Sequence, residues 1–175
     1  MQEIRLTPIS FIVLGLLSWA GKATPYELKG MAAPLSDLWS VQHTQFYGEP
    51  ARLAKAGYLT EQQEATGRRR KTYALTKKGR DALREWLAGP TTAFTELRDP
   101  GLLKLYFGAN PKRVAAEQAE LHRRKLAEYG VFAAQGSPEE AEGPWLALQA
   151  GLAHEREWVR FWETLEQKPR RPRKR

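Results

Sequence analysis

The chain of 175 residues has no cysteine, two methionines and three histidines. Without cysteine it can form neither a disulfide framework nor a thiolate metal site, which suits a reducing cytoplasm. Its longest apolar run, residues 9–19, is too short to span a bilayer. Thr7-Pro8 opens this run as a helix is often opened, so we expect neither a signal peptide nor a membrane span.

Candidates for catalysis are also few. The histidines His43, His122 and His154 stand far apart and pair with no carboxylate at metal-ligand spacing. The sequence shows no phosphate-binding glycine loop and no nucleophile elbow, and it has no thiol. Carboxylates such as Glu128 and Glu155 are interpreted as helix-surface charge. The sequence therefore argues against an enzyme and predicts neither a metal nor a cofactor.

Positive charge is distributed unevenly along the chain, whose formal net charge is +8. Residues 1–88 carry +5 and residues 89–167 carry −3, whereas the last eight residues have six cations and no anion. A basic first part followed by a mildly acidic one indicates a nucleic-acid partner for the first and a protein partner for the second. We predict domains at 1–90 and 91–167 and a basic disordered tail at 168–175, either solubilising or a clamp on DNA phosphates.

The first domain is predicted to be a winged helix-turn-helix. Helical spacing and Thr-Pro openings predict helices over 8–20, 25–31 and 40–56, and β-branched and aromatic residues predict strands over 58–62 and 71–75. Three helices followed by a two-stranded wing make this motif. A fourth helix is expected over 77–88, with Trp86 interpreted as a core residue rather than a ligand-stacking one.

The helix over 40–56 and the wing are the predicted DNA-binding surface. At 100° per residue, Phe46, Pro50 and Leu53 share the inner face, and the outer face is small and polar. Tyr47 is either a base contact or a half-buried packing residue. Arg52 and Lys55 are either phosphate contacts or solvated surface charges. The basic turn between the strands has an alternative interpretation as a solvated hairpin tip. The predicted DNA contacts are His43, Thr44, Gln45, Tyr47, Arg52, Lys55, Arg68, Arg69, Arg70 and Lys71.

The second half is predicted to be helical, with a short helix over 101–107 and two long ones over 111–135 and 139–166. The long helices form an antiparallel hairpin that cannot hide its apolar stripes alone, so a second subunit is expected to cover them. An alternative is a pocket for an apolar or aromatic small molecule. The residues predicted for a dimer interface or effector pocket are Trp145, Leu148, Leu152, Trp158, Phe161, Trp162 and Leu165.

Several motifs together resemble the PadR family of bacterial transcriptional regulators. They are Leu6-Thr7-Pro8 with Leu14-Gly15-Leu16-Leu17, Thr24-Pro25-Tyr26-Glu27-Leu28, Gln45-Phe46-Tyr47 with Arg52-Leu53 and Ala56-Gly57, Gly67-Arg68-Arg69-Arg70 with Tyr73, and Leu75-Thr76-Lys77-Lys78-Gly79. The helical second half resembles the C-terminal dimerisation domain of the family's virulence-activator-like branch. The resemblance implies a homodimeric protein, usually a repressor, whose operator DNA is a short inverted repeat and whose DNA affinity falls when an effector binds. Such a protein is expected in the cytoplasm, on the nucleoid when bound to DNA.

One stretch departs from the family's pattern. The family often has proline directly after the tyrosine, whereas this chain reads Tyr47-Gly48-Glu49-Pro50. Because Pro50 cannot donate a backbone hydrogen bond and crowds the carbonyl of Phe46, the helix is predicted to be kinked or broken near Gly48. A competing hypothesis is a small-molecule-binding or protein-adaptor dimer with a mainly structural winged helix, motivated by the six tryptophans.

Overall fold

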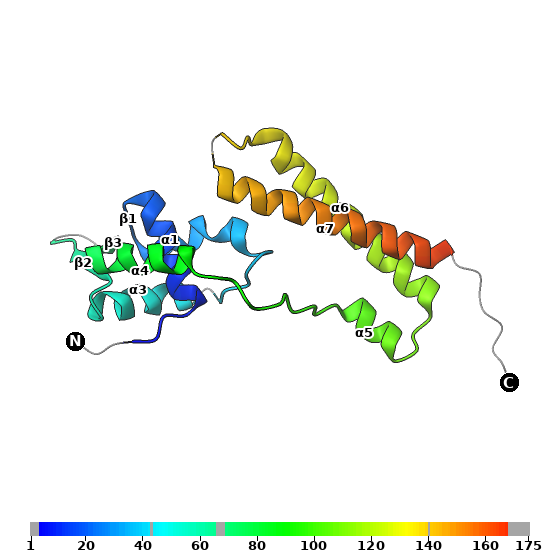
Figure 1. The fold of residues 1–175 in the computed structure, drawn as a ribbon, viewed down its shortest axis with the longest axis horizontal. Coiled ribbons are helices and arrows are strands. Elements are labelled where there is room, and N and C mark those ends of the chain that lie inside the picture. Colours follow the sequence, from blue (N-terminus) through cyan, green and yellow to red (C-terminus); the bar gives the residue numbers. More distant parts are fainter. Residues whose placement is uncertain (1–3, 43, 66–68, 140, 168–175) are drawn as a thin grey trace. The chain divides into compact units, whose positions relative to one another are not determined.

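The structure, a computed structural model, describes residues 4–42, 44–65, 69–139 and 141–167. It divides into two compact units, residues 1–93 and 94–175. Both units are mainly helical, and the first also holds a small antiparallel sheet (Figure 1). The predicted fold class, mainly α with a β-hairpin wing followed by a helical hairpin, is confirmed.

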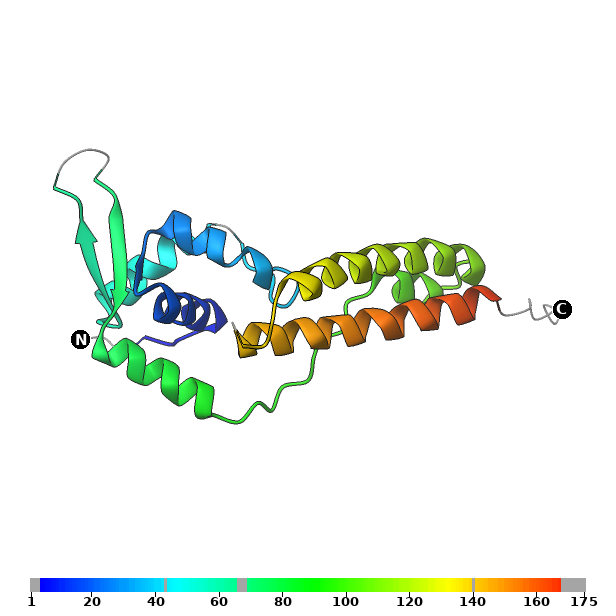
Figure 2. The same ribbon diagram turned by 90° about the horizontal axis from the view of Figure 1, so that it is seen from above.

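The first unit is a winged helix-turn-helix. Its wing, the β2–β3 hairpin, extends away from the helices (Figure 2). The elements in chain order are α1 (Pro8–Ala20), β1 (Lys22–Ala23), α2 (Pro25–Met31), the 3-10 helix η1 (Ala33–Leu35), α3 (Gln45–Lys55), β2 (Leu59–Gln63), β3 (Lys71–Leu75) and α4 (Lys77–Ala88).

Local chemistry explains where α2 and α4 begin. Thr24 accepts a hydrogen bond from the backbone N–H of Glu27 and donates its own backbone N–H to the Glu27 carboxylate, at 3.3 and 2.7 Å. The backbone N–H of Thr24 and its hydroxyl, at 2.9 Å, both donate to the Glu27 carboxylate, and these two bonds lower the pKa of Glu27. The hydroxyl of Thr76 caps α4 by accepting from the backbone N–H of Gly79 at 3.1 Å.

The sheet has the strand order β1-β3-β2, so β3 lies in the middle. Lys22 pairs with Ala74 on one side of β3, and Leu59 pairs with Leu75 on the other. The sequence predicted only the two wing strands. Strand β1 was missed because two residues are too few to show an alternating pattern.

The core of this unit is built on α1, whose Val13, Leu14, Leu16 and Leu17 are all buried. Leu53 of α3 packs in the same cluster. The prediction that Trp86 is a core residue is wrong. Its side chain is 52% exposed and lies flat against Phe11 of α1, with ring centroids 4.6 Å apart, because α4 buries only one face against α1.

The second unit contains α5 (Pro100–Tyr106), α6 (Pro111–Gln135) and α7 (Glu142–Gln167), and the two long helices lie side by side along their length (Figures 1 and 2). Asn110 caps α6 by accepting from the backbone N–H of Lys112 at 3.1 Å. The core is an aromatic side chain, Trp162, set against the small residues Ala115 and Ala119 of α6. None of the described helices is long and apolar enough to cross a membrane.

Candidate nucleic-acid interface

Helix α3 begins at Gln45, five residues later than predicted, because residues 36–42 form turns and irregular chain. The predicted inner face is confirmed, since Phe46, Pro50 and Leu53 are all buried. Of the predicted kink or break near Gly48, the break is wrong: Gln45–Lys55 is helical throughout. Pro50 removes one backbone bond, but its ring is buried with Phe46 and Leu53, and tertiary packing supplies most of the stability of a short helix.

The outer face of α3 and the residue before it carry DNA contacts predicted from the sequence. Thr44, Gln45 and Lys55 are exposed, and Tyr47 is 54% exposed rather than packed in the core. The side-chain oxygen of Gln45 accepts from the backbone N–H of Gln42 at 3.2 Å, which holds the start of the helix. His43 lies outside the described residues.

A buried polar cluster joins α3 to α1, and we name Ser10, Glu49 and Arg52 the α1–α3 clasp. Ser10 donates to Oε1 of Glu49 at 2.6 Å, and Nη2 and Nε of Arg52 donate to the two oxygens of that carboxylate at 2.7 and 2.8 Å. Glu49 is only 9% exposed, whereas the Arg52 side chain is 37% exposed. The hydrogen bond to Glu49 raises the pKa of Arg52.

The clasp fixes the position of α3 relative to α1, because Arg52 also donates to the carbonyl of Arg5, at 3.4 Å, and to Ser10 at 3.1 Å. The burial of Glu49 was not predicted, since one carboxylate in a helix normally indicates solvent-facing charge. The signal that could have found it is its position, one residue before Pro50 and three after Phe46, both on the predicted inner face.

Replacing Glu49 by glutamine is expected to destabilise the protein by about 1–2 kcal/mol, a value reduced because Arg52 is partly solvated. Loss of the charged bonds lets α3 shift relative to α1, so affinity for specific DNA falls about tenfold, while affinity for a random duplex changes less than about twofold. Chemical denaturation and DNA titration measure both effects. Glu85→Gln on the exposed side of α4 is the matched control, and equal behaviour of the two variants would show that the clasp does not position α3.

The wing carries the other predicted contacts. Arg69 and Arg70 are exposed, and Arg69 has a positive φ of 49° next to the turn. The strands close near the tip through the backbone N–H of Glu64, which donates to the carbonyl of Arg70 at 3.0 Å. Arg68 lies outside the described residues.

Lys71 differs from the wing arginines because its ammonium group pairs with the Glu61 carboxylate across the hairpin at 2.7 Å. The hydroxyl of Tyr73 also donates to Glu61, at 3.0 Å, and these two hydrogen bonds lower the pKa of Glu61. Burial, together with this bond, raises the pKa of Tyr73 to about 12. Lys71 therefore joins the two strands, with its positive charge partly balanced by Glu61.

The predicted interface residues of the second unit fall into two groups. Leu152 and Trp162 are buried within the chain itself, so a second subunit is not needed to cover them. Trp162 is buried because Ala115 and Ala119 leave room for its indole and α5 packs against the same cluster through Leu102. The other predicted residues are half-buried or exposed: Trp145, Leu148, Trp158, Phe161 and Leu165.

His122 and Glu155 were not expected to interact, but they bridge α6 and α7, with Nδ1 of His122 2.6 Å from Oε2 of Glu155. Both are largely buried, and the imidazole stacks on Trp158 with ring centroids 5.9 Å apart. The interpretation of Glu155 as surface charge is therefore wrong, because residues 33 apart in sequence meet only after the hairpin forms. The described residues contain no group of three or more potential metal ligands.

Comparison with known families gives each unit a match. Residues 13–85 match the transcriptional regulator PadR-like family, and residues 97–168 match the virulence activator alpha C-terminal domain. The first unit is thus a PadR-like domain, and the PadR-like family is one of transcriptional regulators, not of enzymes.

This PadR-like chain is similar over most of its length to characterised proteins. It is 26% identical over 173 residues to the negative transcriptional regulator PadR of Bacillus subtilis, covering 90% of this chain and 94% of the relative. The crystal structure of B. subtilis PadR in complex with operator DNA has a TM-score of 0.81 at 23% identity, covering 93% of this chain and 98% of that one. The structure of the same protein with p-coumaric acid has a TM-score of 0.76 at 24% identity, covering 90% and 96%.

Proposed function

We propose that this chain is a sequence-specific DNA-binding repressor that acts as a homodimer on an inverted repeat and is released by a small aromatic acid. The observation that carries the proposal is the first unit's surface: an exposed polar and aromatic face on α3 beside a wing with exposed arginines. The name of the B. subtilis relative, a negative regulator, supports repression. Such a protein would work in the cytoplasm, on the nucleoid when bound to DNA.

Residue roles in DNA binding follow from exposure and existing partners. Thr44 and Tyr47 are proposed to contact base edges in the major groove, together with Gln45 if its amide turns away from Gln42. His43, which comes just before the helix in sequence, is proposed as a further DNA contact. Lys55 and the wing cations Arg68, Arg69 and Arg70 are proposed to contact phosphates, with Arg52 and Lys71 aligning the contacts from their places beside Glu49 and Glu61.

The second unit is proposed to form the dimer. It exposes many large apolar side chains that a monomer would leave in water, and a second copy of the chain would cover them. These side chains are Leu103, Tyr106, Phe107, Leu121, Val131, Phe132, Leu146 and Phe161. Two copies related by a two-fold axis would present two recognition helices, which suits an inverted repeat.

The proposed effector is a small aromatic acid, by analogy with a ligand of the B. subtilis relative. The B. subtilis relative has been crystallised with p-coumaric acid, an aromatic carboxylate. Binding of such a compound would release DNA if the DNA-free conformation binds it more tightly than the DNA-bound one does.

The proposal is tested by binding the purified protein to its own promoter-proximal DNA and to a random duplex of equal length, at two salt concentrations. We expect the promoter to be preferred by about 100-fold or more at both, because base contacts do not release counterions. Equal and strongly salt-sensitive binding to both duplexes would contradict sequence-specific regulation at that site.

A further inference from the structure

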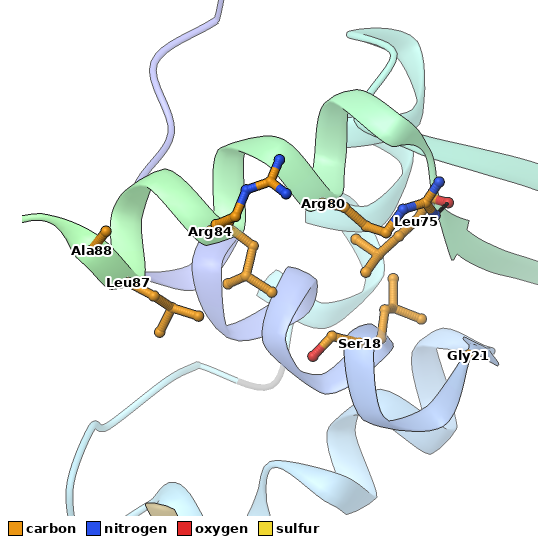
Figure 3. A pocket seen from close by; sticks show the side chains of 9 residues that line it. Ser18, Gly21, Leu75, Arg80, Arg84, Leu87 and Ala88 are labelled. Atoms are coloured by element: carbon orange, nitrogen blue, oxygen red, sulfur yellow. Dashed lines mark hydrogen bonds between the residues drawn. The ribbon is translucent and has the colours of Figure 1, made fainter.

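A groove runs between the second half of α1 and α4 in the first unit, and we name it the α1–α4 groove (Figure 3). Its volume is about 510 Å³, within the range of pockets that bind small molecules. It lies away from the clasp, which joins α3 to the first turn of α1 through Ser10. None of the residues proposed to contact DNA lines it.

The residues of α1 and its C-cap that line the open side of the groove, Ser18 and Gly21, are small. Ser18 is exposed, and its hydroxyl turns back to the carbonyl of Gly15 at 2.7 Å. Gly21 ends the helix with a positive φ of 73°, and a Cβ placed there would meet no atom within 4 Å. Neither residue has a side chain long enough to cross the groove to α4.

The floor of the groove is apolar. Leu17 of α1 and Leu83 of α4 are buried beneath it, and Leu87, one turn further along α4, is 68% exposed at its rim. An exposed leucine next to buried ones offers a surface on which an apolar ligand body would remove further area from water.

The rim carries guanidinium groups. Arg80 and Arg84 lie one helical turn apart on α4, on the side of the groove (Figure 3). Nη1 of Arg80 donates to the carbonyl of Leu75 at 2.9 Å, and Arg84 pairs with Asp81. Each guanidinium has five N–H donors, so these contacts leave donors for a further acceptor.

The balance of charge around the rim favours an anion. The charged residues that line the groove, Arg80 and Arg84, are both cationic, and the acidic Asp81 and Glu85 beside them in sequence do not line it. The carboxylate of Asp81 is shared between Lys77, at 2.7 Å, and Arg84. The hydrogen bond from Lys77 and the neighbouring Arg84 lower the pKa of Asp81, so it stays ionised and still leaves the rim positive.

We propose that the α1–α4 groove binds a small organic carboxylate, with its apolar body on Leu17, Leu83 and Leu87 and its carboxylate on Arg84 and Arg80. Guanidinium groups bind carboxylates in paired hydrogen bonds, and the leucines provide no partner for a second polar end. The inference rests on the proposed function in one respect, that the ligand acts as the effector.

Isothermal titration of the full chain with trans-cinnamate tests the site without DNA. The matched probe is trans-cinnamamide, which has the same body and no charge. We expect saturable binding of the acid with Kd below about 1 mM, and binding of the amide about tenfold weaker, since a charged hydrogen bond is lost. No binding of the acid up to about 10 mM, or equal binding of acid and amide, would overturn the proposal.

Two variants locate the binding. Arg84→Gln removes the charge of an exposed side chain, and Ser18→Leu fills the groove from its open side; each is expected to weaken cinnamate binding at least about fivefold. Arg124→Gln, an equal charge change at an exposed position of α6, should leave it unchanged. The proposal fails if Arg84→Gln and Ser18→Leu bind as the parent does, or if they alter only the dimer's dissociation in ultracentrifugation, which would make the groove a protein interface.

The cinnamate titration and the DNA-binding experiment together test the groove and the regulatory function separately. Cinnamate binding without preference for promoter DNA would keep the site and remove the role of the ligand as an effector. Promoter preference without cinnamate binding would keep the regulator and overturn the site.

Discussion

Replacing Arg68, Arg69 and Arg70 together by alanine is expected to weaken binding to every DNA duplex by about 100-fold at physiological salt. Each lost phosphate contact removes about one unit from the slope of log affinity against log salt concentration, so the slope should flatten by about two to three. The loss should be similar for promoter and random DNA, because phosphates carry no sequence information. Titrations of both duplexes over a range of salt concentrations measure it.

The control changes the same net charge elsewhere. Arg113, Arg124 and Arg156 are exposed on the helices of the second unit, and their replacement by alanine should leave affinity and slope within about twofold of the parent. An unchanged slope in the wing variant would show that the wing is not a DNA contact. A loss confined to promoter DNA would instead assign the wing to base reading in the minor groove.

Replacing Gly79 by alanine is expected to cost about 3 kcal/mol of unfolding free energy. A Cβ at this position would lie 2.2 Å from the carbonyl oxygen of Tyr58 and 3.2 Å from a methyl carbon of Leu75. The Tyr58 oxygen cannot simply move away, because it accepts from both the backbone N–H and the hydroxyl of Thr76, at 3.1 and 2.9 Å. The substitution therefore separates the start of α4 from the beginning of the wing.

The matched variant is Gly15→Ala in the middle of α1, where an added Cβ meets no atom within 4 Å. It is expected to stabilise the protein by about 0.5–1 kcal/mol, since alanine restricts the unfolded chain and favours helix. Chemical denaturation followed by circular dichroism compares the two. Similar stability of both variants would show that α4 does not pack closely on Tyr58.

Features governed by neighbouring residues could be predicted from the sequence. The Thr24-Pro25 opening placed α2 because its cap uses residues three apart, and the Thr76 cap placed α4 in the same way. The two wing strands followed from alternation and from the polar turn between them. The exposure of Tyr47 was left open, because helical spacing placed it beside the outer face without saying what covered it.

Features that depend on contacts distant in sequence could not be predicted. Pro50 predicted a kinked or broken helix, but α3 is unbroken and Pro50 is buried with Phe46. Glu49 meets Ser10 across 39 residues, so its burial cannot be inferred from α3 alone. The dense aromatic cluster around Trp162 suggested a second subunit, whereas the neighbouring helix accommodates it with alanines, and small residues give no hydrophobic signal of their own.

The exposure of the tryptophans differs between the two units, so intrinsic tryptophan fluorescence distinguishes unfolding of one unit from unfolding of the other. Trp19, Trp39 and Trp86 of the first unit are more than half exposed, whereas Trp162 of the second is fully buried among apolar side chains. Exposed indoles emit at long wavelength and are quenched by iodide, while a buried indole emits further to the blue and is protected. Opening of the α6–α7 hairpin should thus appear as a red shift with new iodide quenching, and melting of the winged helix should leave the blue component intact.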